Sequence, residues 1–312
     1  MRNSNPVAGC IGLLIVAACG QTATPAAIVP EVTGRIEDKT IREASGLAPS
    51  RRQDKLLWII NDNGAKETVH ALDFRGRRLG EFDLKKSKNK DWEDLASFRL
   101  DGRPMLMIAD IGDNDARRKH RTLYFVEEPA PEVDGKAQRE WEVDFSYPGG
   151  PRDAEAAAVD IENGQALILS KRDIPARLFA VPLFNEGGPE EHDTPVVAEL
   201  LGPITSLDAP SRQDIEYAPK TKDWYWQPVG MDVSADSHAA VILTYAAVYY
   251  YRREAGQGWF EALNSVPVRV GLGNFENAEA ISFADDNTTV FVTGENKHSR
   301  LLRIDFSGVV TP

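Results

Sequence analysis

Short apolar runs, each bounded by Gly, Asn, Asp or Pro, dominate the chain, and no long helical period is present. The runs Leu56–Ile60, Met105–Ala109 and Ala166–Leu169 have the length of buried β-strands, and each is followed by a polar cluster. Turn pairs such as Asn163-Gly164 separate consecutive runs. This pattern predicts an all-β fold built from short antiparallel strands.

A phrase with one carboxylate ahead of a short stretch of small and apolar residues recurs five times. The carboxylates at the heads of the five copies are Glu43, Glu93, Glu155, Asp232 and Glu279. Strand-like segments follow each head, and most copies accommodate a set of four. A repeat of this length is typical of a β-propeller, in which each copy forms one blade. We therefore expect a single propeller of five four-stranded blades.

Two features bear on the number of blades. The fifth copy provides only three strands, and the strand-like segment 31–36 is expected to supply the missing outer strand and to close the ring. An insertion at about 205–228 lengthens the third gap, and Asp214–Ala218 within it resembles the repeated phrase. A propeller of six blades is therefore the alternative. Five blades are preferred because no strand set follows Asp214–Ala218 before the next copy begins.

The first 30 residues have the pattern of a secretion signal and a linker. A positive start precedes an apolar stretch of about twelve residues, shorter than the roughly 20 needed to cross a bilayer. The sequence Val16-Ala17-Ala18-Cys19-Gly20 resembles a bacterial lipobox, which implies a signal peptide at 1–18 and lipidation of Cys19. Residues 19–30 would form a flexible tether, and 31–312 the propeller. We expect a membrane-anchored protein of the bacterial cell envelope, at the outer membrane or periplasmic side in a Gram-negative cell.

Composition narrows the possible functions. The chain has 312 residues and two cysteines, Cys10 in the signal peptide and Cys19 at the lipidation site, so disulfide, thiol and cysteine–zinc chemistry are not expected. Its 48 acidic and 36 basic residues give a net charge of −12, which argues against a nucleic-acid partner. We expect a monomer.

The repeated carboxylates suggest a metal site. The first strand of each propeller blade lines the central channel, so the five heads are expected to converge at one channel mouth. Carboxylates in a dry space must be protonated or neutralised by a cation, and all-oxygen ligands suit Ca²⁺. A second shell would come from the ends of the second strands, at Asp62, Asp110, Asp113, Asn114 and Glu295. Alternatively, the acids accept hydrogen bonds from backbone N–H groups and hold the blades together.

Basic residues follow several of these polar clusters, at Arg117, Arg118, Lys171, Arg172 and Lys297. Near a bound cation they would favour a small anionic substrate such as a phosphate ester. Charged residues in exposed turns are the alternative explanation. Within the acidic set, Glu93 and Glu155 are candidates for a general base.

Four motifs together carry a resemblance to known proteins: Asp91–Leu95, Ile108–Asn114, Arg152–Ala156 and Asn277–Ile281. They resemble a largely uncharacterised family of secreted bacterial β-propeller proteins over residues 43–306. The layout is more distantly similar to calcium-dependent nucleotidases, phytase-like propellers and gluconolactonase-type propellers. The resemblance implies a propeller and secretion, and by analogy of fold a calcium-dependent activity.

Two functions remain open from the sequence. The first is a metal-dependent hydrolase that acts on a phosphoester or a lactone at the channel mouth. The second is a non-catalytic propeller that binds an envelope ligand or protein and contains a structural metal or none. No Gly-x-Ser-x-Gly motif is present, so a serine hydrolase of that type is not supported.

Overall fold

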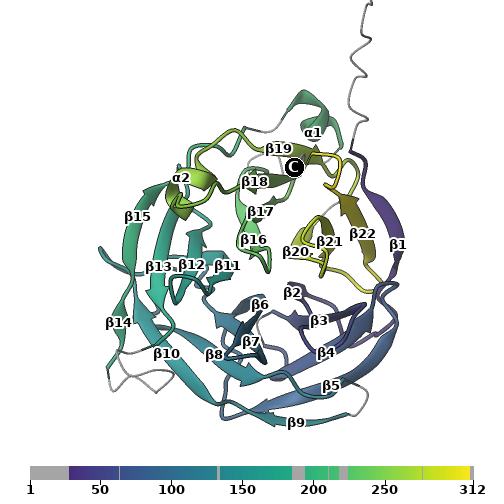
Figure 1. The fold of residues 1–312 in the computed structure, drawn as a ribbon, viewed down its shortest axis with the longest axis vertical. Helices are drawn as coiled ribbons and strands as arrows, with labels where there is room; N and C mark the ends of the chain where they lie inside the picture. The colour runs from purple at the N-terminus through teal and green to yellow at the C-terminus, as the bar shows by residue number, and fades with distance from the viewer. Residues whose placement is uncertain are drawn as a thin grey trace, which may run out of the picture.

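Five β-sheets surround a central channel in the computed structural model (Figure 1). The structure describes residues 28–62, 64–131, 134–184, 194–209, 211–217, 224–275 and 277–309. The prediction of a five-bladed propeller with four-stranded blades is confirmed. The predicted signal peptide, Cys19 and the predicted tether as far as residue 27 lie outside the described residues.

The strands of each blade run in chain order from the channel outward, except that the N-terminal strand β1 forms the outer edge of blade five. Blade one contains β2 (Ala44–Pro49), β3 (Leu56–Asn61), β4 (Thr68–Asp73) and β5 (Arg78–Lys85). Blade two contains β6 (Trp92–Leu100), β7 (Arg103–Asp110), β8 (Arg121–Glu127) and β10 (Trp141–Ser146). Blade three contains β11 (Ala154–Asp160), β12 (Gln165–Ser170), β13 (Arg177–Pro182) and β15 (Glu199–Pro203). Blade four contains β16 (Pro228–Val233), β17 (Ala239–Thr244), β18 (Ala247–Arg252) and β19 (Val268–Gly271). Blade five contains β20 (Ala278–Phe283), β21 (Thr289–Gly294), β22 (Arg300–Asp305) and the N-terminal strand β1 (Glu31–Arg35).

Strand β1 closes the ring, as the sequence predicts. It pairs antiparallel with β22, with Glu31 opposite Arg303. A glycine in β1 allows the neighbouring blade to approach, because a Cβ at Gly34 would overlap the carbonyl oxygen of Arg75 in the turn between β4 and β5. The first strand in the chain therefore joins the last blade to the first.

Two short strands that the sequence analysis missed extend the outer edges of blades one and two. Strand β9 (Gly135–Gln138) comes from the β8–β10 connection and pairs parallel with β5. Strand β14 (Val196–Val197) comes from the β13–β15 connection and pairs parallel with β10. Each one covers a sheet edge with chain from the following blade and so links neighbouring blades.

The insertion at 205–228 does not form a sixth blade in its described part. The described residues of the phrase that resembles a blade start, 214–217, lie in the short helix α1 (Arg212–Tyr217), and the structure has five blades, so the six-blade alternative is wrong. Tyr225 is buried among hydrophobic residues of blades three and four. A second short helix, α2 (Trp259–Leu263), follows β18 and packs on the same hydrophobic cluster.

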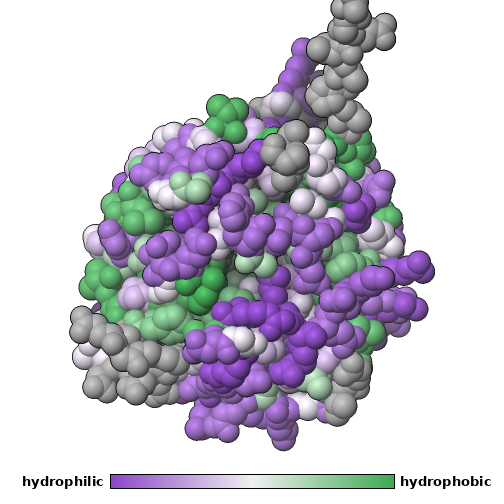
Figure 2. Space-filling view, viewed as in Figure 1, coloured by the Kyte–Doolittle hydropathy of each residue, from purple (hydrophilic) through white to green (hydrophobic). Residues whose placement is uncertain are grey.

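The hydrophobic core is divided into five clusters, one between each pair of neighbouring blades. The stacked rings of Phe125 and Trp141, 4.6 Å apart between centroids, belong to the cluster between blades two and three. The cluster between blades five and one includes Phe291 and Leu57, so packing as well as strand pairing closes the ring. Hydrophilic residues cover much of the face of the ring seen in Figure 2, around a hollow near its centre. Neither of the helices in the described part of the chain has the length and apolar character needed to cross a membrane.

Candidate metal centre at the channel mouth

A β-bulge at the start of every inner strand determines which side chains reach the channel mouth. The pairing of the first two strands shifts by one residue at equivalent positions in all five blades. The bulged residues are Ser45, Glu93, Glu155, Val229 and Glu279. A bulge re-aims the side chain of its extra residue. The structure therefore brings three of the five predicted acids, Glu93, Glu155 and Glu279, to equivalent positions.

The other two predicted acids do not occupy this level. Glu43 is exposed, lies two residues before the bulge of blade one, and donates its backbone N–H to the Asn61 side chain at 3.2 Å. Asp232 lies three residues beyond the bulge of blade four, deeper along the channel. The expectation of five equivalent acids is therefore corrected to three. The five copies of the phrase were aligned on their carboxylates, whereas the structurally equivalent positions are those of the bulges. Glu43 and Asp232 were therefore misaligned.

Two buried acids along the channel accept backbone hydrogen bonds. Asp94 Oδ1 accepts the N–H of Leu95 at 2.8 Å, and its Oδ2 accepts those of Ala157 at 2.8 Å and Met231 at 3.1 Å. Asp232 accepts the N–H groups of Val233 at 2.8 Å and Phe283 at 2.9 Å. Ala157, Met231 and Phe283 belong to the inner strands of other blades, and no strand of the described chain pairs with the channel-facing edges of those strands. The alternative of acids that hold blades together is thus realised at Asp94 and Asp232.

The acidic cluster best suited to a cation consists of Asp62, Asp91 and Glu93. One oxygen of each lies within 4.8 Å of the others. Asp62 follows β3 in blade one, whereas Asp91 and Glu93 begin blade two, so the cluster spans the joint between these blades. Asp91 and Glu93 are only 6% and 5% exposed, and within the described residues Asp91 Oδ1 has no hydrogen-bond partner. Asp91 begins the motif Asp91–Leu95, but no role was predicted for it from the sequence.

The pKa values of this cluster show electrostatic strain. Burial, followed by the charge of Asp62, raises the pKa of Asp91 to about 7. Burial and the charges of Glu155, Asp62 and Asp91 raise the pKa of Glu93 well above its ordinary value. Groups in this situation either hold protons or gain from a bound cation.

Gly112 provides the space in which two of these carboxylates meet. A Cβ at residue 112 would overlap Glu93 Oε1 and would lie 2.6 Å from Asp91 Oδ2. The Gly112 N–H also donates to the Asp91 carbonyl oxygen at 3.2 Å. The glycine of the Asp110–Asn114 motif is therefore required by the close approach of the acidic side chains.

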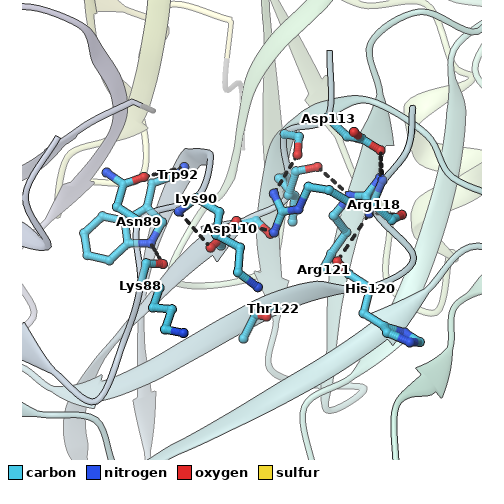
Figure 3. Close-up of polar contacts among 12 residues, drawn as sticks. Lys88, Asn89, Lys90, Trp92, Asp110, Asp113, Arg118, His120, Arg121 and Thr122 are labelled. Carbon is cyan, nitrogen blue, oxygen red and sulfur yellow. Dashed lines mark hydrogen bonds and ion pairs between the residues drawn. The ribbon is translucent and has the colours of Figure 1, made fainter. Parts of the chain in front are cut away.

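Arginines brace the loop that follows β7 (Figure 3). Arg118 donates to Asp110 Oδ1 at 2.5 Å and to the Gly112 carbonyl at 2.7 Å. Arg121, which is buried, donates to Asp113 Oδ2 at 2.5 Å. Asp110 and Asp113, predicted as a second shell, therefore act through these arginines to fix the loop that carries Gly112.

The predicted anion-binding residues are mostly engaged with protein acids. Arg118 is paired with Asp110, Lys171 contacts Glu155, and Arg172 donates to Asp153 Oδ2 at 2.6 Å. Arg172 also contacts the predicted second-shell residue Asn114. Arg117 is exposed and pairs with Asp115 at 3.4 Å, and Lys297 is exposed. Buried carboxylates are numerous at the mouth. They form ion pairs with Arg118, Lys171 and Arg172.

The other half of the mouth is organised around Lys171. Its Nζ contacts Glu155 Oε1 and lies 3.1 Å from the hydroxyl oxygen of Tyr245. Tyr245 in turn is hydrogen-bonded to Glu279. Glu155 Oε2 is buried and has no hydrogen-bond partner in the described part of the chain. Tyr245 was not among the predicted site residues.

The charges in this half are closely coupled. Burial raises the pKa of Glu155 to about 7, even though Lys171 opposes the shift. Burial and the charge of Glu155 raise the pKa of Glu279 well above its ordinary value. Burial alone would lower the pKa of Lys171, but Glu155 and Glu279 raise it, so Lys171 remains charged. Glu295, predicted in the second shell, has a pKa raised by burial and by Glu43.

The opposite end of the channel has different chemistry. A pocket of about 360 Å³ there is lined by Arg51, Ser97 and Asp285 among other residues. Arg51 lies 3.7 Å from Asp285. Its positive charge lowers the pKa of Asp232 and so opposes the increase that burial causes. Asp232 thus belongs electrostatically to this end rather than to the acidic mouth.

Comparison with protein-family models gave no match, and comparison with curated proteins gave no similar sequence. The resemblance described from the sequence motifs therefore stays a prediction. The function is therefore inferred from the geometry of the mouth.

Proposed function

We propose that the propeller binds one divalent cation between blades one and two, through Asp62, Asp91 and Glu93. The observation that carries this proposal is the approach of three carboxylates across a blade joint, with a buried oxygen of Asp91 that has no hydrogen-bond partner in the described part of the chain. Carboxylate ligands without Cys or His favour a hard cation, and Ca²⁺ accepts the flexible geometry of such a set.

We further propose that the mouth catalyses hydrolysis. A bound cation would polarise the bond to be cleaved and lower the pKa of a coordinated water. Glu155 is the candidate general base, since its Oε1 is held by Lys171 whereas its Oε2 has no hydrogen-bond partner among the residues that the structure describes. The engagement of Arg118, Lys171 and Arg172 with acids favours an uncharged ester such as a lactone over a phosphoester.

One observation favours a second candidate function. Because the cation ligands come from two blades, a bound ion would also tie the ring together without any catalysis. In that case the propeller would be an envelope protein that binds a ligand or a partner protein and contains a structural calcium ion.

Calcium titration of the chelator-treated protein by calorimetry tests the metal proposal. We expect one equivalent to bind, and Glu93→Gln to weaken binding at least tenfold. Glu254→Gln is the matched control, because Glu254 is exposed and lies outside the channel. A wild-type protein that binds no calcium would rule out the metal centre.

Hydrolysis is tested separately with a panel of lactones and phosphoesters. Turnover that requires calcium and is lost in Glu155→Gln supports the enzyme. If calcium binds and raises the melting temperature but no substrate turns over, the structural-metal function replaces the hydrolase.

The cellular setting is also a proposal. Lipidation at Cys19 would anchor the propeller to the bacterial envelope. Metabolic labelling with a palmitate analogue should mark the wild-type protein and not Cys19→Ser, and equal labelling of both would exclude this anchor.

A further inference from the structure

Lys171 brings a positive charge into the half of the mouth that lacks the Asp62 cluster. It directly follows β12 in blade three, and its side chain is only 9% exposed. Two N–H groups of the ammonium are directed at Glu155 Oε1 and the Tyr245 hydroxyl. Among the described residues the ammonium has no third hydrogen-bond partner.

The surroundings of this ammonium have the composition of a hard-cation site. Glu155 and Tyr245 provide oxygen atoms in contact with it, and Tyr245 links it to Glu279. The ammonium also lies 5.4 Å from the centre of the Tyr245 ring. Glu155 Oε2, which is buried and has no hydrogen-bond partner within the described residues, offers a further oxygen. All-oxygen sets that include carboxylates are the ligands that Ca²⁺ uses.

The charge balance explains why a cation is needed in this half. Glu93, Glu155 and Glu279 occupy equivalent bulges, and each is at least nine-tenths buried. A single divalent ion held between blades one and two leaves Glu155 and Glu279 to be neutralised by other means. Buried carboxylates without a countercharge are strongly destabilising.

We propose that the mouth contains two cation positions and that the Lys171 ammonium permanently fills the second. This inference rests on the proposed metal function at the first position. The protein thereby limits itself to one divalent ion, and the remaining N–H of Lys171 is a donor for an oxygen atom of a ligand bound beside that ion.

Replacement of Lys171 tests this arrangement through metal stoichiometry. Lys171→Met keeps much of the length of the side chain and removes its charge, whereas Lys171→Arg keeps the charge. In calcium titrations by calorimetry we expect one equivalent for the wild type, two for Lys171→Met and one for Lys171→Arg. In chelator the melting temperature of Lys171→Met should lie below that of the wild type, and millimolar calcium should raise it by more than it raises those of the wild type and Lys171→Arg, because calcium at the first position stabilises all three proteins alike.

The outcomes separate this inference from the proposed function. A wild type that binds no calcium overturns the proposed function, although an equivalent bound by Lys171→Met alone would still support the second position. One equivalent in both the wild type and Lys171→Met overturns the inference and leaves the proposed function intact. If Lys171→Met folds only in calcium and then binds two equivalents, the second position is supported. If it fails at every calcium concentration while Lys171→Met combined with Glu155→Met folds, Lys171 is merely half of a structural ion pair and the inference is wrong.

Discussion

Asp94 should be one of the residues on which the stability of the ring depends most. Its two carboxylate oxygens accept three backbone N–H groups, and two of these belong to the inner strands of blades three and four. Among the described residues no strand pairs with these two on the channel side, so Asp94 takes the place of a neighbouring strand. Asp94→Ala removes the acceptor and leaves the three N–H groups in a buried environment.

The expected loss follows from the number of stranded donors. A buried donor without an acceptor costs about 1–3 kcal/mol. Three such donors would together cost about 3–9 kcal/mol of stability. The loss is smaller than this sum because the variant no longer has to bury the Asp94 carboxyl group. We expect Asp94→Ala to lower the free energy of unfolding by about 4 kcal/mol. Asp94→Asn, which keeps one acceptor oxygen, should lose about half as much.

Urea unfolding followed by tryptophan fluorescence measures these differences. The matched control is Asp115→Ala, because Asp115 is exposed and its ion pair is with the exposed Arg117. The control should change the free energy of unfolding by less than about 0.5 kcal/mol. If Asp94→Ala is as stable as this control, Asp94 does not join the blades and the reasoning fails.

Three further predictions concern the mouth, the channel and the closure. Gly112→Ala should weaken calcium binding at least tenfold in calorimetry, because its Cβ would displace Asp91 and Glu93, whereas Gly308→Ala, with open space around it, should not. Burial raises the pKa of Asp232 to about 7 from 3.8, so this group stabilises the fold below about pH 4 and the contribution is lost as pH rises through 7. Asp232→Asn should therefore flatten the decline in the free energy of unfolding between pH 5 and pH 8 by about 2–3 kcal/mol, measured by urea unfolding at each pH. Deletion of residues 28–35 should lower the melting temperature and cause self-association in size-exclusion chromatography, because it exposes the edge of β22.

Each of these has a clear contrary result. Unchanged calcium affinity in Gly112→Ala would mean that the acids do not meet at this glycine. A parallel pH profile in Asp232→Asn would show that Asp232 titrates normally in the folded protein. A monomeric deletion variant with an unchanged melting temperature would mean that β1 contributes little to closure.

The blades could be predicted from the sequence because each is built from local signals. Apolar runs such as Leu56–Ile60 and turn pairs such as Asn163-Gly164 lie within one repeat, so they mark strands without knowledge of the rest of the fold. The closing strand could also be predicted, since the last repeat lacked one strand. Strands β9 and β14 could not, because they are short, largely exposed and held by parallel pairing to a different blade.

The candidate site was only partly predictable, and the reason is register. A shift of one residue turns a side chain to the other face of a strand, and a bulge introduces such a shift without a residue pattern that marks it. Aligned on carboxylates, Glu43 and Asp232 looked equivalent to Glu93, but the bulges place Ser45 and Val229 there. The partners of Lys171 and Arg118 could not be predicted either, because they lie in segments that are distant in the chain or that a loop brings together.

The closing strand also determines how the ring would respond to force. Strand β1 is the first element of the propeller, so a load applied to the residues before Glu31 acts first on its pairing with β22. Pulled along its length, β1 loads its backbone hydrogen bonds together, in shear, rather than one after another as in unzipping. The strand that completes the fifth blade is thus also the point where a pull on the N-terminal segment would begin to open the ring.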